Sequence, residues 1–314
     1  MKKIAFHSGQ LGLRGTEVAL YDYARYNEEI LGNKSIITVQ DPNIRKGWSD
    51  PSAIKKFKDR FPVFYYKDFS EVDKILDDNN IDIFYMQKAG DRSILPKEIK
   101  TVIHSVFQYN EPHGDVYAYI SKWLGDLYNK PYVPYICDLP NHNDDLRELL
   151  KIPKDATVFG RHGGIETFDI GYAQESVIEI SNERDDIYFI FLNTQRFTNN
   201  KNVIFLNGTS DMYQKVRFIN TCDAMLHARQ RGESFGLAIA EFSLRNKPII
   251  CWKGGTDLAH VDMLGDTAFY YENKTELKSI LSDFKIDNSV NYDIYKKYNP
   301  KDVMQKFKEV FIDK

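Results

Sequence analysis

Short apolar runs alternate with longer stretches of helical period along this 314-residue chain, and this alternation limits its fold more than any other feature. The pattern predicts β-α-β units, in which helices cover a parallel sheet. In the first half, strands are expected at residues 3–8, 35–39, 63–66, 81–86 and 101–107, and helices at 16–31, 51–60 and 70–79. We therefore expect one doubly wound sheet there.

The pattern then starts again after a polar, proline-containing segment at residues 138–155. Five more strands are expected at residues 157–160, 187–192, 203–206, 224–227 and 248–252. The sequence thus predicts an α/β protein with two Rossmann-like domains, 1–145 and 146–295, and a terminal helix, 296–314, that can return to the first domain. Two such domains in tandem place a ligand cleft between the carboxyl ends of their sheets.

Composition excludes several functional classes. The 42 Lys and Arg residues against 45 Asp and Glu residues give a net charge of -3, so no basic field for nucleic acid exists. Three cysteines without a C-x-x-C pair make a disulfide framework or a structural zinc improbable, and no cluster has metal-ligand spacing. No apolar stretch suits a signal peptide or a transmembrane helix, so we expect a cytoplasmic protein. The 20 Tyr and 20 Phe residues either fill the cores or stack on sugars or bases.

Two carboxylates mark the segment between the fourth and fifth strands of the second half. The predicted helix Leu237–Leu244 is apolar except for Ser243 and one charged residue, Glu241. An ionised carboxylate in apolar surroundings is costly unless it is paired, so Glu241 either faces solvent or binds a pair of ligand hydroxyls. Glu233 lies in the loop before this helix, where it either complements the helix dipole or contacts a ligand.

Other candidates lie near the ends of predicted strands. The loop with Gly9, Gly12 and Gly15 precedes a helix and is either a phosphate site or an ordinary turn. Arg161 follows a predicted strand and has two glycines behind it, so it either binds phosphate oxygens or lies on the surface. His104, within the last strand of the first half, is either a cleft residue or a core histidine.

The letters G-E-S-F-G, which begin at Gly232, also match the G-x-S-x-G nucleophile elbow of α/β-hydrolases. A serine hydrolase that uses Ser234 is therefore an alternative enzyme class. Its triad would need His260, the only histidine downstream, and Asp257, three residues before it. In hydrolases the acid and the histidine come from separate strand ends, which argues against this alternative.

Taken together, these features resemble a known enzyme family. The segment E-S-F-G-L-A-I-A-E, from Glu233 to Glu241, resembles the E-x7-E signature of family-four retaining glycosyltransferases, which have the GT-B fold. It is followed, as in that family, by K-P-I-I-C-W-K-G-G. The segments R-G-T-E, T-V-I-H, Y-I-S and V-F-G-R-H resemble further motifs of the family, so the resemblance extends over most of the chain.

The resemblance implies a metal-independent retaining transferase that moves a sugar from a UDP- or GDP-sugar to a glycan or another hydroxyl acceptor. It implies no obligatory cofactor, and the nucleotide diphosphate sugar serves as co-substrate. By this resemblance Glu241 would bind the ribose hydroxyls and Arg161 the diphosphate. Glu233 would bind the donor sugar, together with the backbone of Ser234, Phe235 and Gly236. Gly15 would approach the phosphates, and His104 would lie near the sugar. Glu233 and His104 are the implied catalytic residues.

The sequence also departs from the family's pattern. A lysine normally follows the G-R of the second domain by a few residues, but Glu166 and Thr167 occupy that stretch. Arg196, Arg229 or Arg231 are the candidate replacements for this phosphate-binding cation. Without such a replacement, the chain would be a sugar-nucleotide-binding module that has lost catalysis.

Overall fold

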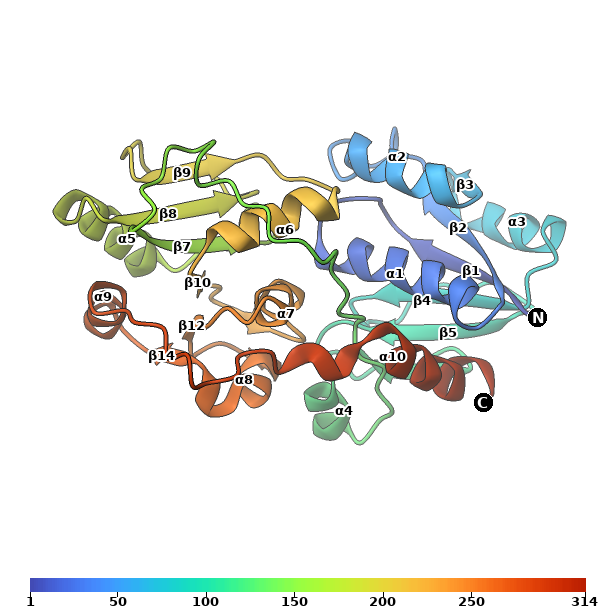
Figure 1. Cartoon of the computed structure of the whole chain (residues 1–314). Helices are drawn as coiled ribbons and strands as arrows, with labels where there is room; N and C mark the ends of the chain where they lie inside the picture. Colours follow the sequence, from blue (N-terminus) through green and yellow to red (C-terminus); the bar gives the residue numbers. More distant parts are fainter. The chain divides into compact units, whose positions relative to one another are not determined.

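The computed structural model describes all 314 residues, and they divide into two compact units (Figure 1). The first unit comprises residues 1–136 together with 298–314, and the second comprises residues 137–297. The C-terminal segment therefore belongs to the first unit, as the predicted fold allows. None of the helices is both long and apolar enough to cross a membrane.

The first unit is a six-stranded parallel sheet with the order β3-β2-β1-β4-β5-β6. Its strands are β1 (Lys3–Ser8), β2 (Lys34–Gln40), β3 (Val63–Tyr66), β4 (Ile83–Lys88), β5 (Lys100–Ser105) and β6 (Val116–Tyr119). Its α-helices are α1 (Gly15–Glu29), α2 (Pro51–Arg60), α3 (Val72–Asp78), α4 (Lys122–Tyr128) and α10 (Pro300–Phe307). Side chains at the N-caps start several of these helices, and Asp50, for example, accepts from the amides of Ser52 and Ala53.

The second unit repeats this architecture with the order β14-β12-β10-β7-β8-β9. Its strands are β7 (Thr157–His162), β8 (Ile187–Leu192), β9 (Val203–Leu206), β10 (Ala224–His227), β12 (Ile249–Trp252) and β14 (Phe269–Tyr271). A separate pair joins β11 (Gly232–Glu233) to β13 (Asp257–Leu258). The helices are α5 (Gly171–Glu183), α6 (Met212–Thr221), α7 (Leu237–Leu244), α8 (Ala259–Leu264) and α9 (Lys274–Ser282).

Both sheets are doubly wound, because in each the strand order reverses direction beside the first strand of the unit. This switch point lies between β1 and β4 in the first unit and between β7 and β10 in the second. The connections diverge to opposite faces there, and the carboxyl ends of the two strands leave a crevice where open α/β sheets bind ligands. Ligand-binding residues are therefore expected in the loops after β1, β4, β7 and β10.

Aromatic side chains fill the core that attaches the C-terminal segment to the first unit. Phe307 of α10 lies 5.2 Å from Tyr23 between ring centroids, and Phe311 lies 5.6 Å from Tyr85. All four side chains are buried. Core filling therefore accounts for these aromatics, since each buried ring removes a large apolar area from water.

Candidate functional site

The connection from β10 to α7 forms the loop that the sequence pattern predicts. β10 ends at His227, Glu233 lies in the short strand β11, and α7 begins at Leu237. Gly232 and Gly236 have φ angles of +78° and +85°, which favour glycine. At Gly232 a Cβ would also lie 2.2 Å from the backbone oxygen of Asp257. The conformation of the loop around Glu233 therefore requires glycine at positions 232 and 236.

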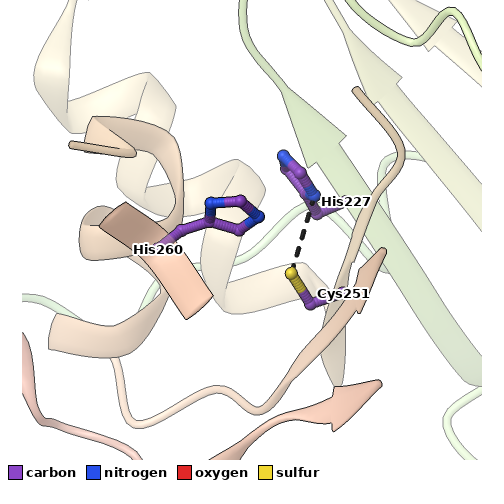
Figure 2. Close-up of side chains that lie close together, drawn as sticks. All are labelled: His227, Cys251 and His260. Carbon is purple, nitrogen blue, oxygen red and sulfur yellow. Dashed lines mark hydrogen bonds between the residues drawn. The ribbon is translucent and has the colours of Figure 1, made fainter. Parts of the chain in front are cut away.

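Three buried side chains that are distant in sequence meet beneath this loop: His227, Cys251 and His260 (Figure 2). Each offers one potential metal-ligand atom, and these atoms all lie within 4.8 Å of one another. His227 Nδ1 lies 3.7 Å from Cys251 Sγ. The sequence predicted no such cluster, because the three residues come from β10, β12 and α8 and share no ligand spacing.

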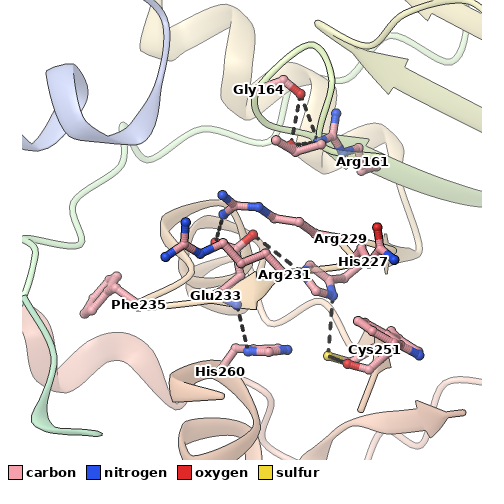
Figure 3. Close-up of polar contacts among 12 residues, drawn as sticks. Arg161, Gly164, His227, Arg229, Arg231, Glu233, Phe235, Cys251 and His260 are labelled. Carbon is pink, nitrogen blue, oxygen red and sulfur yellow. Dashed lines mark hydrogen bonds and ion pairs between the residues drawn. The ribbon is translucent and has the colours of Figure 1, made fainter. Parts of the chain in front are cut away.

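Glu233 is held from three directions (Figure 3). Arg229 Nη1 donates to Glu233 Oε2 at 2.8 Å, and His227 Nε2 lies 3.5 Å from Glu233 Oε1. The Glu233 amide donates to His260 Nδ1 at 3.3 Å. Burial raises the pKa of the Glu233 carboxyl, but the hydrogen bond to His227 and the charge of Arg229 outweigh it and bring the pKa to about 2. Glu233 is thus an ionised, oriented acceptor at neutral pH.

Arg161 is a buried cation with neutral partners. The structure places it inside β7, which ends at His162, two residues beyond the predicted end of that strand. Its guanidinium donates to Thr194 Oγ1 at 2.6 Å, to the Gly164 carbonyl at 3.1 Å and to Thr167 Oγ1, and it forms no ion pair. Only 4 % of its surface is exposed, and burial lowers its pKa to about 10, so it keeps its charge at neutral pH. The charges of Glu233 and Asp169 raise the pKa of Arg161 only from a distance, so its guanidinium has no ion-pair partner of its own, which favours binding of an anion.

The three arginines considered as replacements for the family lysine have different surroundings. Arg229, which bonds Glu233, is close enough to Arg161 for its charge to lower the pKa of Arg161. Arg231 instead bonds Asp257, and Arg196 lies over the ring of Phe205. Of the three candidates, Arg229 is therefore the arginine whose charge acts on Arg161. Figure 3 shows Arg229 next to Glu233 and Arg161 next to Gly164.

Glu241 is buried, as its sequence surroundings suggest, and two side chains of the chain itself satisfy its carboxylate. Lys215 Nζ of α6 donates to Oε1 at 2.9 Å, and His162 Nε2 at the end of β7 lies 2.9 Å from Oε2. Burial raises the pKa of Glu241, but Lys215 and His162 outweigh it and bring the pKa to about 2. The sequence did not predict the role of Lys215. A buried carboxylate indicates that a cation lies near it, but the sequence does not show which helix supplies that cation.

The arrangement around Ser234 does not form a hydrolase triad. Ser234 makes no hydrogen bond to His260, whose Nδ1 accepts from the Glu233 amide. Asp257 bonds Arg231 Nε at 2.6 Å. Ser234 also lacks the positive φ angle of a strained backbone, such as a nucleophile elbow stores. The G-x-S-x-G segment is therefore not accompanied by a Ser-His-Asp triad.

The Phe235 ring packs into the core of the second unit, so only the backbone of this residue faces the Glu233 loop. Its ring packs on Tyr295, with ring centroids 5.7 Å apart, and its carbonyl accepts from the Tyr295 hydroxyl at 3.2 Å. In Figure 3 the ring points away from the Glu233 carboxylate. The segment Ser234–Gly236 is thereby anchored to the core of the second unit.

His104 is a core histidine. It is fully buried, Nδ1 lies 2.5 Å from the Tyr85 hydroxyl, and Nε2 lies 2.9 Å from the Val133 carbonyl and 3.2 Å from that of Tyr119. Burial lowers its pKa to about 3, so the ring is neutral. A contact with the sugar finds no support here, because both ring nitrogens are occupied and no atom is accessible.

The first unit has a cavity of about 570 Å³ at its own switch point. Its lining includes His7, Glu17, Arg45, Trp48 and Lys88. Gly15, the predicted phosphate neighbour, is the exposed first residue of α1. The loop after β1 thus combines a helix start with a cavity that mixes charged and aromatic walls.

Comparisons with known proteins identify the fold. No protein-family model and no curated protein sequence matches this chain. Among solved structures, HepE from Anabaena in complex with UDP and glucose matches with a TM-score of 0.71 at 15% identity, over 99% of this chain and 98% of that one. A glycosyltransferase from Rickettsia africae matches with a TM-score of 0.69 at 15% identity, over 100% and 99% of the two chains.

A third similar structure is WaaG, a glycosyltransferase involved in lipopolysaccharide biosynthesis. It matches with a TM-score of 0.67 at 9% identity, over 99% of this chain and 100% of that chain. These likenesses span both units and their connecting segments from end to end. The chain therefore has the α/β fold of the GT-B glycosyltransferases, with two Rossmann-like sheets.

Proposed function

We propose that this protein is a retaining glycosyltransferase that takes its sugar from a nucleoside diphosphate sugar, without a metal ion in the reaction. The observation that carries the proposal is Arg161, a buried guanidinium with only neutral partners at the switch point of the second sheet. A diphosphate supplies the missing countercharge, and an arginine fork matches its oxygens. The UDP in the HepE structure supports a nucleotide donor for this fold.

Arg161, Arg229 and the start of α7 together suit a departing diphosphate. The two guanidiniums supply fixed positive charge, and the first amides of α7 have no partner within the helix. Groups held in place before the reaction stabilise the charge that develops on the leaving group. Arg229 takes the part of the lysine that the family pattern has near Thr167.

Glu233 and Glu241 have separate roles in this proposal. Glu233, with the backbone of Ser234–Gly236, binds hydroxyls of the donor sugar as an acceptor and positions it. Glu241 accepts from ribose hydroxyls with the lone pairs that Lys215 and His162 leave open, since a carboxylate has about four acceptor positions. Retention follows from attack on the same face with help from the leaving phosphate, so no second catalytic carboxylate is needed.

The acceptor binds in the cavity of the first unit. Glu17 and Lys88 offer hydrogen bonds for hydroxyl groups, and Trp48 offers a flat apolar face of the kind that stacks on sugar rings. Together these side chains give the mixture of polar and apolar contacts that a glycan or another polyhydroxyl compound uses.

Titration calorimetry with UDP, GDP and ADP tests donor binding. We expect one of the three to bind well, and Arg229→Ala to weaken it by 10-fold or more, because each arginine–phosphate bond is charge-assisted. Arg184→Ala is the matched control, since Arg184 is a partly exposed arginine of the same unit that pairs with Asp186. Failure of all three nucleotides to bind would reject the proposal.

Sugar transfer or donor hydrolysis separates an enzyme from a binding module. We expect Glu233→Gln to abolish turnover and to keep most of the nucleotide affinity, because Glu233 faces the sugar in this proposal. NMR of the product should show the anomeric configuration of the donor, and turnover should continue in the presence of EDTA. Nucleotide binding without turnover in the native protein would identify a module that has lost catalysis.

A further inference from the structure

We propose that His227, Cys251 and His260 form a binding site for Zn²⁺ or a similar thiophilic metal ion, separate from the transfer reaction. Two imidazoles and a thiolate are ligands that Zn²⁺ takes in proteins. Their relative exposures are 3 %, 0 % and 0 %, so all three are shielded from water. His260 Nε2 is buried and has no hydrogen-bond partner. An unpartnered polar atom beside a thiol and a second imidazole indicates a position for a ligand.

The distances suit a metal ion after small side-chain movements. Tetrahedral zinc with bonds of about 2.3 Å to sulfur and about 2.0 Å to nitrogen places sulfur and nitrogen roughly 3.5 Å apart. His227 Nδ1 and Cys251 Sγ are 3.7 Å apart. All donor atoms lie within 4.8 Å of one another, so the most distant pair must close by roughly 1 Å.

One of the three ligands, His227, already has a suitable polar partner. His227 Nε2 lies 3.5 Å from Glu233 Oε1, so it bears the proton that faces this carboxylate and leaves the Nδ1 lone pair for the metal. This is the carboxylate–histidine–metal arrangement of many zinc sites. Cys251 loses its proton to water as the sulfur–metal bond forms. The thiolate then offsets one of the two positive charges of the ion, and Glu233, which also pairs with Arg229, lies next to His227.

His260 connects the metal site to the Glu233 loop. Its Nδ1 accepts from the Glu233 amide, so the neutral ring carries its proton on Nε2. A metal on Nε2 moves that proton to Nδ1, which then faces the Glu233 N–H and cannot accept from it. Metal uptake therefore breaks this bond and loosens the segment that holds Glu233. The metal-binding inference does not depend on the proposed transferase activity.

Cobalt substitution tests the site directly. Untagged protein is stripped with EDTA and dialysed overnight against Co²⁺. We expect one Co²⁺ per chain, a thiolate-to-cobalt charge-transfer band and the visible bands of tetrahedral cobalt, all displaced by Zn²⁺. Cys251→Ser should remove the charge-transfer band. Cys222→Ser should keep it, because Cys222 is equally buried but is not part of the His227, Cys251 and His260 cluster.

Absence of the charge-transfer band in native protein would overturn the proposal, and so would an undiminished band in folded Cys251→Ser. If Cys251→Ser fails to fold, His260→Gln serves as the second variant and should lose the tetrahedral spectrum. Hydrogen exchange of peptides that span Gly232–Gly236 tests the coupling. We expect faster exchange of the Glu233 amide with Zn²⁺ bound, and unchanged exchange would reject the coupling to the loop.

Discussion

Replacement of Glu17 by glutamine should make the stability of the first unit less dependent on pH. Glu17 lies in the first turn of α1 at 5 % exposure, and its Oε2 has no hydrogen-bond partner. Burial raises the pKa of this carboxyl from 4.5 to about 7, against smaller effects of Thr16, Arg14 and Gln10. The folded chain therefore holds this proton more tightly than the unfolded chain does.

The sign and size of the effect follow from this difference. Below pH 4.5 both states carry the proton, and Glu17 has no effect through its charge. Between pH 4.5 and 7 the unfolded state releases this proton while the folded state still holds it, so the folded state loses about 3 kcal/mol of stability by pH 7 and little more above it. Glu17→Gln avoids that loss. For a unit of this size, we expect the melting temperature at pH 8 to rise by roughly 6 to 12 °C.

Scanning calorimetry of both proteins at pH 4.5, 6 and 8 measures this. The gain from Glu17→Gln should be near zero at pH 4.5 and should grow with pH. Glu29→Gln, on the same helix, is the control, because Glu29 is exposed and bonds Arg25 at the surface. Its loss should change the stability by less than about 1 kcal/mol and should not stabilise. A gain from Glu17→Gln that is equal at all three pH values would refute this account of Glu17.

Three other substitutions test the cores. Lys215→Met should destabilise the second unit by about 3 to 5 kcal/mol in urea unfolding, because it leaves the Glu241 carboxylate buried without its cation, and a second change, Glu241→Gln, should recover part of the loss. The stability that ionised Glu241 contributes should be lost as pH falls from 4.5 towards 2. Gly160→Ala should also destabilise the second unit, since its Cβ would lie 2.2 Å from Cys222 Sγ, and the double variant with Cys222→Ala should melt at a higher temperature than Gly160→Ala alone. Phe311→Ala should cost the first unit about 3 to 5 kcal/mol by calorimetry, because the ring is buried in its aromatic core.

The sheets were largely predictable because buried parallel strands appear as short apolar runs. The predicted ends of β1, β3, β8, β9 and β10 match those of the structure. β14, with the three residues F-Y-Y, is too short to give a recognisable run. At β7, the charged and polar pair Arg161 and His162 hid the last two residues of the strand. Strand pairing continues there because both side chains find buried polar partners.

The site was less predictable, because its contacts join distant segments. The sequence indicated that Glu241 needs a polar partner. Which side chain this is depends on the face that α6 presents to α7, and that face carries Lys215. His104 had two possible roles, and only the surrounding carbonyls of Tyr119 and Val133 distinguish them. The meeting of His227 with Cys251 depends on the register of β10 against β12, where these two residues are paired directly. Sequence patterns contain no information on such register.

The return of residues 298–314 to the first unit has a consequence for synthesis of the chain. During translation, residues 1–136 emerge from the ribosome before the rings of Phe307 and Phe311 exist to complete their core. At 5–20 residues per second, the intervening residues 137–297 take roughly 8 to 30 s to be made. For that period the apolar surface around Tyr23 and Tyr85 lacks the two rings that bury it, and exposed apolar surface of this kind is what chaperones bind.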